Sequence, residues 1–185
     1  VADTVAYYTV EAKFVDAAGN RSCRWASSLC VNPHIEPVPF DSAGSGLRGA
    51  YYSYDRWNDF KALLAERVDT TINFDWGAGS PGAFAPSDYW SVRWTGKLNV
   101  TAAGDYTLYL DAKDGRRVWL DGVQVMLKWS DGATETIWSG ALSSGAHPIV
   151  IEYYHGYSSA KCKLAWSGPG FTKRIVPREA LSQQK

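Results

Sequence analysis

Short stretches of alternating apolar and polar residues, separated by turn residues at regular spacing, run along this chain from Leu47 onward. In one of them Trp90, Val92 and Trp94 alternate with polar residues, so that the large apolar side chains fall on one side. Such a period of two predicts a strand with one buried face. Many strands of this kind, without alternating helical segments, indicate an antiparallel sandwich or barrel. The predicted fold class is therefore all-β.

The predicted strands lie near Leu47–Ser53, Thr71–Trp76, Tyr89–Val100, Asp105–Ala112, Arg117–Asp121, Gln124–Lys128, Glu135–Leu142, His147–Tyr154 and Ala160–Trp166. One segment, Asn58–Arg67, is predicted to be a helix. Its apolar and long side chains recur at helical spacing, at Phe60, Leu63, Leu64 and Arg67. Asp121-Gly122 predicts a tight hairpin turn, because this pair readily adopts the positive φ angles that such a turn needs.

Composition agrees with an all-β chain and excludes some partners. Aromatic residues make up 14% of the sequence, and they pack well on pleated surfaces. The 19 basic and 19 acidic residues balance, so nucleic acid and anionic membrane surfaces are not expected as partners. No apolar run approaches the roughly 18 residues of a membrane span, and the N-terminus carries no signal-peptide pattern.

Residues 1–45 differ from the rest. Ala6–Asp16 alternates like a half-buried strand, and a lone strand needs a sheet to join. The sequence of this segment resembles the late strands of fibronectin type III or bacterial Ig-like modules. A segment rich in Pro, then in Gly and Ser, follows as a linker. We therefore expect a strand segment with a linker over 1–45 and a β-barrel over 46–185. The strand belongs either to a truncated neighbouring module or to a sheet of another copy of the chain.

The cysteines predict one disulfide. Cys23 and Cys30 lie close together in a polar segment and are expected to form a bridge. Cys162 alternates with Leu164 and Trp166, which predicts a buried free thiol on a strand. A bridge from Cys162 to the N-terminal segment is the open alternative.

Two N-glycosylation motifs are present, at Asn20-Arg21-Ser22 and Asn99-Val100-Thr101. Together with the cysteine pair, they favour an extracellular glycoprotein, either secreted or at the cell surface.

Several motifs follow one another in a fixed order after residue 45. They are Gly46-Leu-Arg-Gly-Ala-Tyr-Tyr52, Ile72-Asn-Phe-Asp-Trp76, Tyr89-Trp-Ser-Val-Arg-Trp-Thr-Gly96, Ala103-Gly-Asp-Tyr-Thr107, Asp114-Gly-Arg-Arg-Val-Trp-Leu-Asp-Gly122 and Ile151-Glu-Tyr-Tyr154. In this order they resemble the protective-antigen-type lectin-like domain family, called PA-fourteen. The resemblance spans about residues 46–181, including the ending Ile175–Leu181.

This resemblance implies a barrel or sandwich of two antiparallel sheets. The family occurs in adhesins, glycosidases and toxins, and its members often bind carbohydrate. In calcium-dependent members, two adjacent Asp residues joined by a cis peptide hold Ca²⁺, which coordinates sugar hydroxyls. A second loop, after the Glu-Tyr-Tyr strand, completes that site.

This chain departs from the calcium pattern. The Asp pair falls on Lys113-Asp114, so an ammonium stands where a carboxylate is expected. The second loop, His155–Ser159, contains no carboxylate. Because calcium takes about six to eight oxygen ligands and gains affinity from their charge, we expect no calcium cofactor here. Asp111 and Asp114 are the carboxylates that a metal would use, although Asp111 is about 10 Å away along an extended chain.

The loops named by the resemblance give the candidate glycan-binding residues Asp114, Trp129, His155 and Tyr157. Trp129 lies in a polar loop and is the aromatic residue that we most expect to be exposed; the alternative is that it covers the mouth of the barrel. Asp114-Gly115 also fits an ordinary turn, and His155 and Tyr157 also fit ordinary loop packing.

The sequence contains no zinc-protease, phosphate-loop or nucleophile-elbow motif, so we expect no enzyme. The predicted function is a non-catalytic, carbohydrate-binding, lectin-like module that does without the usual calcium site. The alternative is a structural subunit of an adhesin or filament, in which the N-terminal strand docks on a neighbouring copy.

Overall fold

The computed structural model describes residues 46–55 and 58–183. The N-terminal strand and linker, the Cys23–Cys30 disulfide and the Asn20 glycosylation site lie outside this range. Within the described residues the chain consists of antiparallel strands and a short 3-10 helix, η3 (Arg178–Ala180). No helix in this part is long and apolar enough to cross a membrane.

The strands form two sheets. The first has seven strands, in the order β2 (Asn58–Asp69), β1 (Leu47–Asp55), β4 (Trp90–Val100), β9 (Gly145–His155), β6 (Arg116–Leu120) and β7 (Val123–Lys128), with β12 (Leu181–Ser182) also paired to β4. The second has five, in the order β11 (Phe171–Ile175), β10 (Ala160–Gly168), β5 (Gly104–Lys113) and β8 (Ala133–Leu142), with β3 (Asn73–Gly77) also paired to β10. Every pairing is antiparallel.

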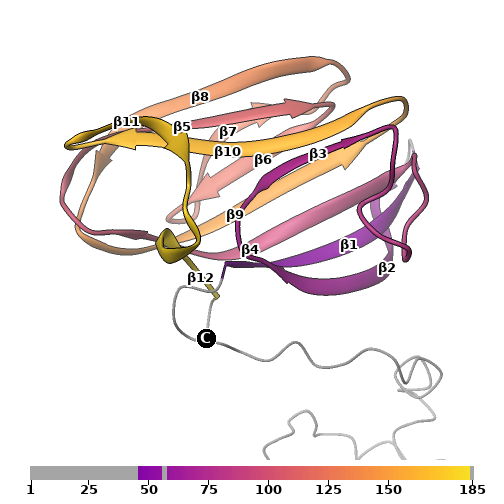
Figure 1. The fold of residues 1–185 in the computed structure, drawn as a ribbon, viewed down its shortest axis with the longest axis horizontal. Helices are drawn as coiled ribbons and strands as arrows, with labels where there is room; N and C mark the ends of the chain where they lie inside the picture. Colours follow the sequence, from indigo (N-terminus) through magenta and orange to yellow (C-terminus); the bar gives the residue numbers. More distant parts are fainter. Residues whose placement is uncertain (1–45, 56–57, 184–185) are drawn as a thin grey trace, which may run out of the picture. The chain divides into compact units, whose positions relative to one another are not determined.

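The two sheets lie as facing layers, with β8, β5 and β10 in one and β9, β4 and β1 in the other (Figure 1). The predicted all-β antiparallel sandwich is confirmed. The sequence pattern missed the short strands β11 and β12.

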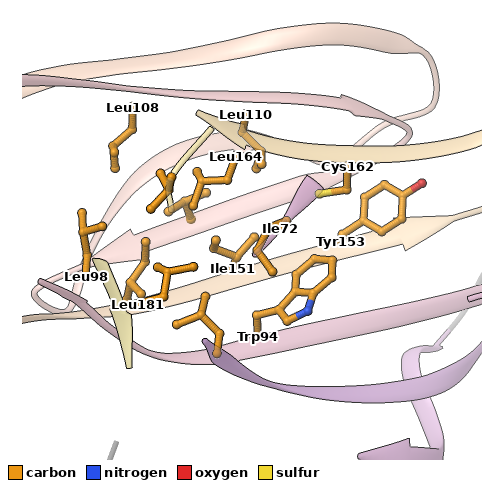
Figure 2. Packing of buried hydrophobic residues seen from close by; sticks show 14 of the residues in the cluster. Ile72, Trp94, Leu98, Leu108, Leu110, Ile151, Tyr153, Cys162, Leu164 and Leu181 are labelled. Atoms are coloured by element: carbon orange, nitrogen blue, oxygen red, sulfur yellow. The ribbon is translucent and has the colours of Figure 1, made fainter. Parts of the chain in front are cut away.

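The core fills the space between the layers. Figure 2 shows Ile151 and Trp94 from one sheet pointing toward Leu110 and Leu164 from the other. Trp90, Val92 and Trp94 are fully buried, as their alternation predicts. Fully burying one such apolar side chain contributes about 1.5–3 kcal/mol.

The thiol of Cys162 is buried in this core and is free, as predicted. It lies in β10, on the inward-facing side that it shares with Leu164 and Trp166.

The helix predicted over Asn58–Arg67 is wrong, because this segment is β2, paired along its length with β1. Opposite the adjacent pair Tyr51 and Tyr52, β2 places Ala65 and Leu63, so that Leu64 is an extra residue. Such a bulge breaks the period of two and shifts the following side chains to the other face. The resulting spacing of apolar residues resembles that of a helix.

Two Asp-Gly steps play different parts. Asp121 and Gly122 have φ angles of 51° and 80° and close the β6–β7 hairpin, as predicted. Asp114 has a φ of 77° and lies, with Gly115, between β5 and β6. Because β5 and β6 belong to different sheets, this second step carries the chain from one layer to the other.

Candidate functional site

Four loop segments meet at the end of the sandwich where the chain passes from β5 to β6; together we call them the loop end. They comprise residues 113–115, 129–132, 155–158 and 88–89. The Gly132 amide donates to Asp114 Oδ1 at 3.2 Å, and the Gly156 amide donates to Asp114 Oδ2 at 3.1 Å. The Tyr89 amide donates to the Gly156 carbonyl at 2.9 Å. The loops that the family resemblance brings together therefore do meet.

Asp114 is the centre of this arrangement. Its side chain is buried, and its backbone is in the left-handed region that Asp tolerates better than most residues. Arg116 Nη1 donates to the Asp114 carbonyl at 2.7 Å, which holds the turn from below. Burial opposes ionisation of the Asp114 carboxyl, but the hydrogen bonds from His155, Gly156 and Gly132 outweigh it and lower the pKa. The buried carboxylate therefore ties three loops together.

His155 is fully buried beside this carboxylate. Its Nδ1 lies 3.0 Å from Asp114 Oδ2, while its Nε2 lies 3.4 Å from Asp88 Oδ1 without a hydrogen bond. Asp88 Oδ1 accepts the Ser158 amide at 3.2 Å, so the Asp88 segment and the segment after His155 are joined. With no exposed surface, His155 supports the loop end from the inside, and its contact with a ligand stays a prediction.

The side chain of Lys113 contacts two of the same loop segments. Its Nζ donates to the Tyr157 carbonyl at 3.0 Å and lies 3.8 Å from Asp114 Oδ1. The ammonium also lies 5.9 Å from the centre of the Tyr157 ring.

These residues do not fit the calcium that the resemblance implies for part of the family. Both oxygens of Asp114 already accept hydrogen bonds, and an ammonium stands beside them. Asp111 pairs with Lys161 at 2.8 Å instead of turning toward Asp114. Across residues 46–55 and 58–183, no group of three or more His, Cys, Asp or Glu side chains is placed to hold a metal, and every peptide bond is trans.

Trp129 is half-buried and is therefore less exposed than its polar loop predicts. Its ring meets Tyr154 edge-on with centroids 4.9 Å apart, and the Arg117 guanidinium lies 3.6 Å from its centre. Arg117 in turn donates to Glu152 at 2.8 Å, and Arg93 donates to the other oxygen of Glu152 at the same distance. Trp129 thus covers a charged cluster on the outer face of the seven-stranded sheet.

The exposed aromatic rings at the loop end are those of Tyr89 and Tyr157, exposed by 45% and 58%. Tyr157 was a sequence candidate, whereas Tyr89 and Asp88 were missed because the motif around Tyr89 matches a strand. Tyr89 has a φ of 61°, and β4 begins only at Trp90. Tyr54 stacks on both Tyr89 and Tyr154, with centroids 6.5 and 4.8 Å apart, and so connects the exposed ring to the buried one.

The second glycosylation motif lies in β4. Asn99 is half-buried, and its Nδ2 donates to Ser182 Oγ of β12 at 3.1 Å. A glycan on Asn99 would be bonded to this same nitrogen; glycosylation of Asn99 stays a prediction.

A family model described as "PA14 domain" matches residues 44–180. This chain belongs to the PA14 domain family. Over 143 residues it is 41% identical to the anti-sigma-I factor RsgI3 of Acetivibrio thermocellus, a match that covers 76% of this chain and 22% of that protein. This PA14 chain thus spans about a fifth of the length of that relative.

Comparison with solved structures gives the same family likeness. An anti-sigma factor domain-containing protein superposes with a TM-score of 0.72 at 39% identity, covering 77% of this chain and 48% of the other. A PA14 sugar-binding domain from an RTX adhesin superposes with a TM-score of 0.64 at 21% identity, covering 76% of this chain and 99% of the other. The second likeness shows the shared fold.

Proposed function

We propose that this PA14 domain is a non-catalytic carbohydrate-binding module of an extracellular protein, and that the sugar binds at the loop end. The observation that carries the proposal is the pair of exposed rings, Tyr89 and Tyr157, on two segments that hydrogen bonds hold side by side. The side chain of Asp88 is 41% exposed and belongs to the same pair of segments.

This combination suits a sugar. The apolar C–H face of a pyranose packs on an aromatic ring, while a carboxylate accepts hydrogen bonds from its hydroxyl groups. Binding sites commonly combine apolar walls with a few fixed polar groups, and they are usually formed before the ligand arrives. The buried contacts of Asp114 supply that preorganisation, because they fix the loops that carry the rings.

The comparisons support the same proposal. The adhesin domain with this fold is described as sugar-binding, and the relative at higher identity is an anti-sigma-I factor. We propose that the module gives a longer protein of that kind its contact with carbohydrate outside the cell.

A glycan array, followed by titration calorimetry with the best ligand, tests the proposal. Tyr157→Ala and Tyr89→Ala should each weaken binding about three- to tenfold, which corresponds to the loss of one ring contact. Leu127→Ala is the matched control, because Leu127 is 62% exposed but lies on β7, outside the loop end. Binding of no glycan at high protein concentration, or equal losses in all three variants, would refute the proposal.

A further inference from the structure

The ammonium of Lys113 lies among groups that come from three of the loop segments. Lys113 is the last residue of β5, and its ammonium donates to the carbonyl of Tyr157 in the 155–158 segment. The ammonium also faces the Asp114 carboxylate, which accepts the amide of Gly132. Its side chain is 23% exposed, so water screens these interactions only in part. The single positive charge of Lys113 thus links the Asp114 segment to the 155–158 segment.

From this geometry we infer that Lys113 is a built-in substitute for a divalent cation: the domain orders its loop end with the ammonium and needs no metal. The inference concerns how the loops are held and does not depend on whether they bind a sugar.

The oxygen atoms at the loop end are already occupied in a way that agrees with this role. Asp114 Oδ1 accepts the Gly132 amide, and Asp114 Oδ2 accepts the Gly156 amide and faces His155. Asp131 accepts the hydroxyl of Tyr154 at 2.7 Å. A divalent cation would have to break these hydrogen bonds and approach an ammonium of like charge. Two unit charges about 4 Å apart at a protein surface repel by several kcal/mol at an effective dielectric constant near 20.

The contacts of Lys113 also explain how the loop end tolerates a buried carboxylate. An isolated charge out of water is costly, and it is normally accompanied by an opposite charge and by donors. Here backbone amides and His155 provide the donors, while Lys113 provides the opposite charge at 3.8 Å. The metal would add a charge that the chain already supplies.

Hydrogen exchange and thermal unfolding test this inference without any sugar. In Lys113→Gln, the amides of Gly156 and Ser158 should exchange about three- to tenfold faster, the range for losing one typical hydrogen bond, while core amides of β4 stay unchanged. Lys161→Gln is the matched control, since this lysine is about as exposed as Lys113 and its Lys–Asp pair lies on the outer face of the same sheet as β5. Equal exchange in Lys113→Gln and the wild type would overturn the inference.

A second measurement tests whether the loop end needs a metal. The unfolding temperature of the wild-type chain should be the same in excess calcium and in excess chelator. In Lys113→Asp, which restores a carboxylate at this position, the unfolding temperature should fall in chelator and recover at least in part with calcium. Stabilisation of the wild type by calcium would contradict the inference, as would a Lys113→Asp variant as stable in chelator as the wild type.

Discussion

The ring of Tyr154 lies against the backbone of Gly115, so that a Cβ at position 115 would lie 2.0 Å from Tyr154 Cε1. The amide of Tyr154 also donates to the Gly115 carbonyl at 3.0 Å, which leaves the two residues little freedom to separate. Only a residue without a side chain fits here. The glycine that follows Asp114 is thus required by packing against Tyr154 of β9.

Gly115→Ala should therefore destabilise the domain by about 1–3 kcal/mol, the usual cost of overpacking a filled site. Urea unfolding followed by Trp fluorescence measures the change. Gly156→Ala is the control, because a Cβ there would meet Asp114 Oδ2 at an ordinary 3.9 Å. Equal stability of the two variants would show that Tyr154 can move aside.

Asp114→Asn should destabilise the domain by about 1–3 kcal/mol at neutral pH, because an amide cannot accept on both sides as the carboxylate does. The pKa of Asp114 is lowered on folding, so its contribution is present above the unfolded pKa of about 4 and is lost as the pH falls through the folded value. The difference between variant and wild type should then shrink below about pH 4. A difference that grows with acidity would contradict this origin.

His147 should make stability depend on pH in the opposite sense. Partial burial opposes its protonation, but the Ser143 carbonyl and the Asp121 carboxylate, 3.0 and 2.7 Å from its two ring nitrogens, outweigh it and raise the pKa. Protonated His147 therefore stabilises the fold. This stabilisation is fully present below the pKa of His147 in the unfolded chain, about 6.5, and is lost as the pH rises through its pKa in the folded protein.

Asp121→Asn tests this pair, since Asn also tolerates the positive φ at position 121. Because the Asp121 side chain is about half exposed (48%), the loss should stay below about 1 kcal/mol. Denaturant unfolding should show the loss well below about pH 6.5 and almost none well above it. A loss of equal size at both pH values would assign it to the turn instead.

Cys162 should resist thiol reagents until the domain unfolds. Its side chain has no exposed surface, and burial raises the pKa of the thiol, so the reactive thiolate is scarce. In a Cys23→Ser/Cys30→Ser chain, labelling by a coloured disulfide reagent should follow the unfolding curve in denaturant. Rapid labelling of the native chain would contradict the buried position.

The parts of the fold that depend on local alternation could be predicted from the sequence. Trp90, Val92 and Trp94 face the core because a strand places every second residue on one side. The pattern failed at β2, where the extra residue Leu64 removes that alternation. It also could not show that β5 and β6 belong to different sheets, because pairing depends on contacts between segments far apart in the chain.

The candidate site was predictable only as far as the resemblance reached. It brought together the loops of Asp114 and His155, and Lys113 signalled the departure from calcium. The exposure of Tyr89 depends on its positive φ just before β4, which no periodic pattern announces. The burial of Trp129 depends on Arg117 and Tyr154, which reach it from other strands.

The extra residue in β2 has a consequence for how this domain meets other chains. β2 is the last strand on its side of the seven-stranded sheet, so its outer backbone could template an added strand. The bulge at Leu64 interrupts the even spacing of donors and acceptors that an incoming strand would have to match. At the far side of the other sheet, β8 pairs with β5 in unbroken register from Ala133 to Leu142. If a neighbouring strand ever joins this sandwich, the regular border of β8 offers it a better match than the bulged border of β2.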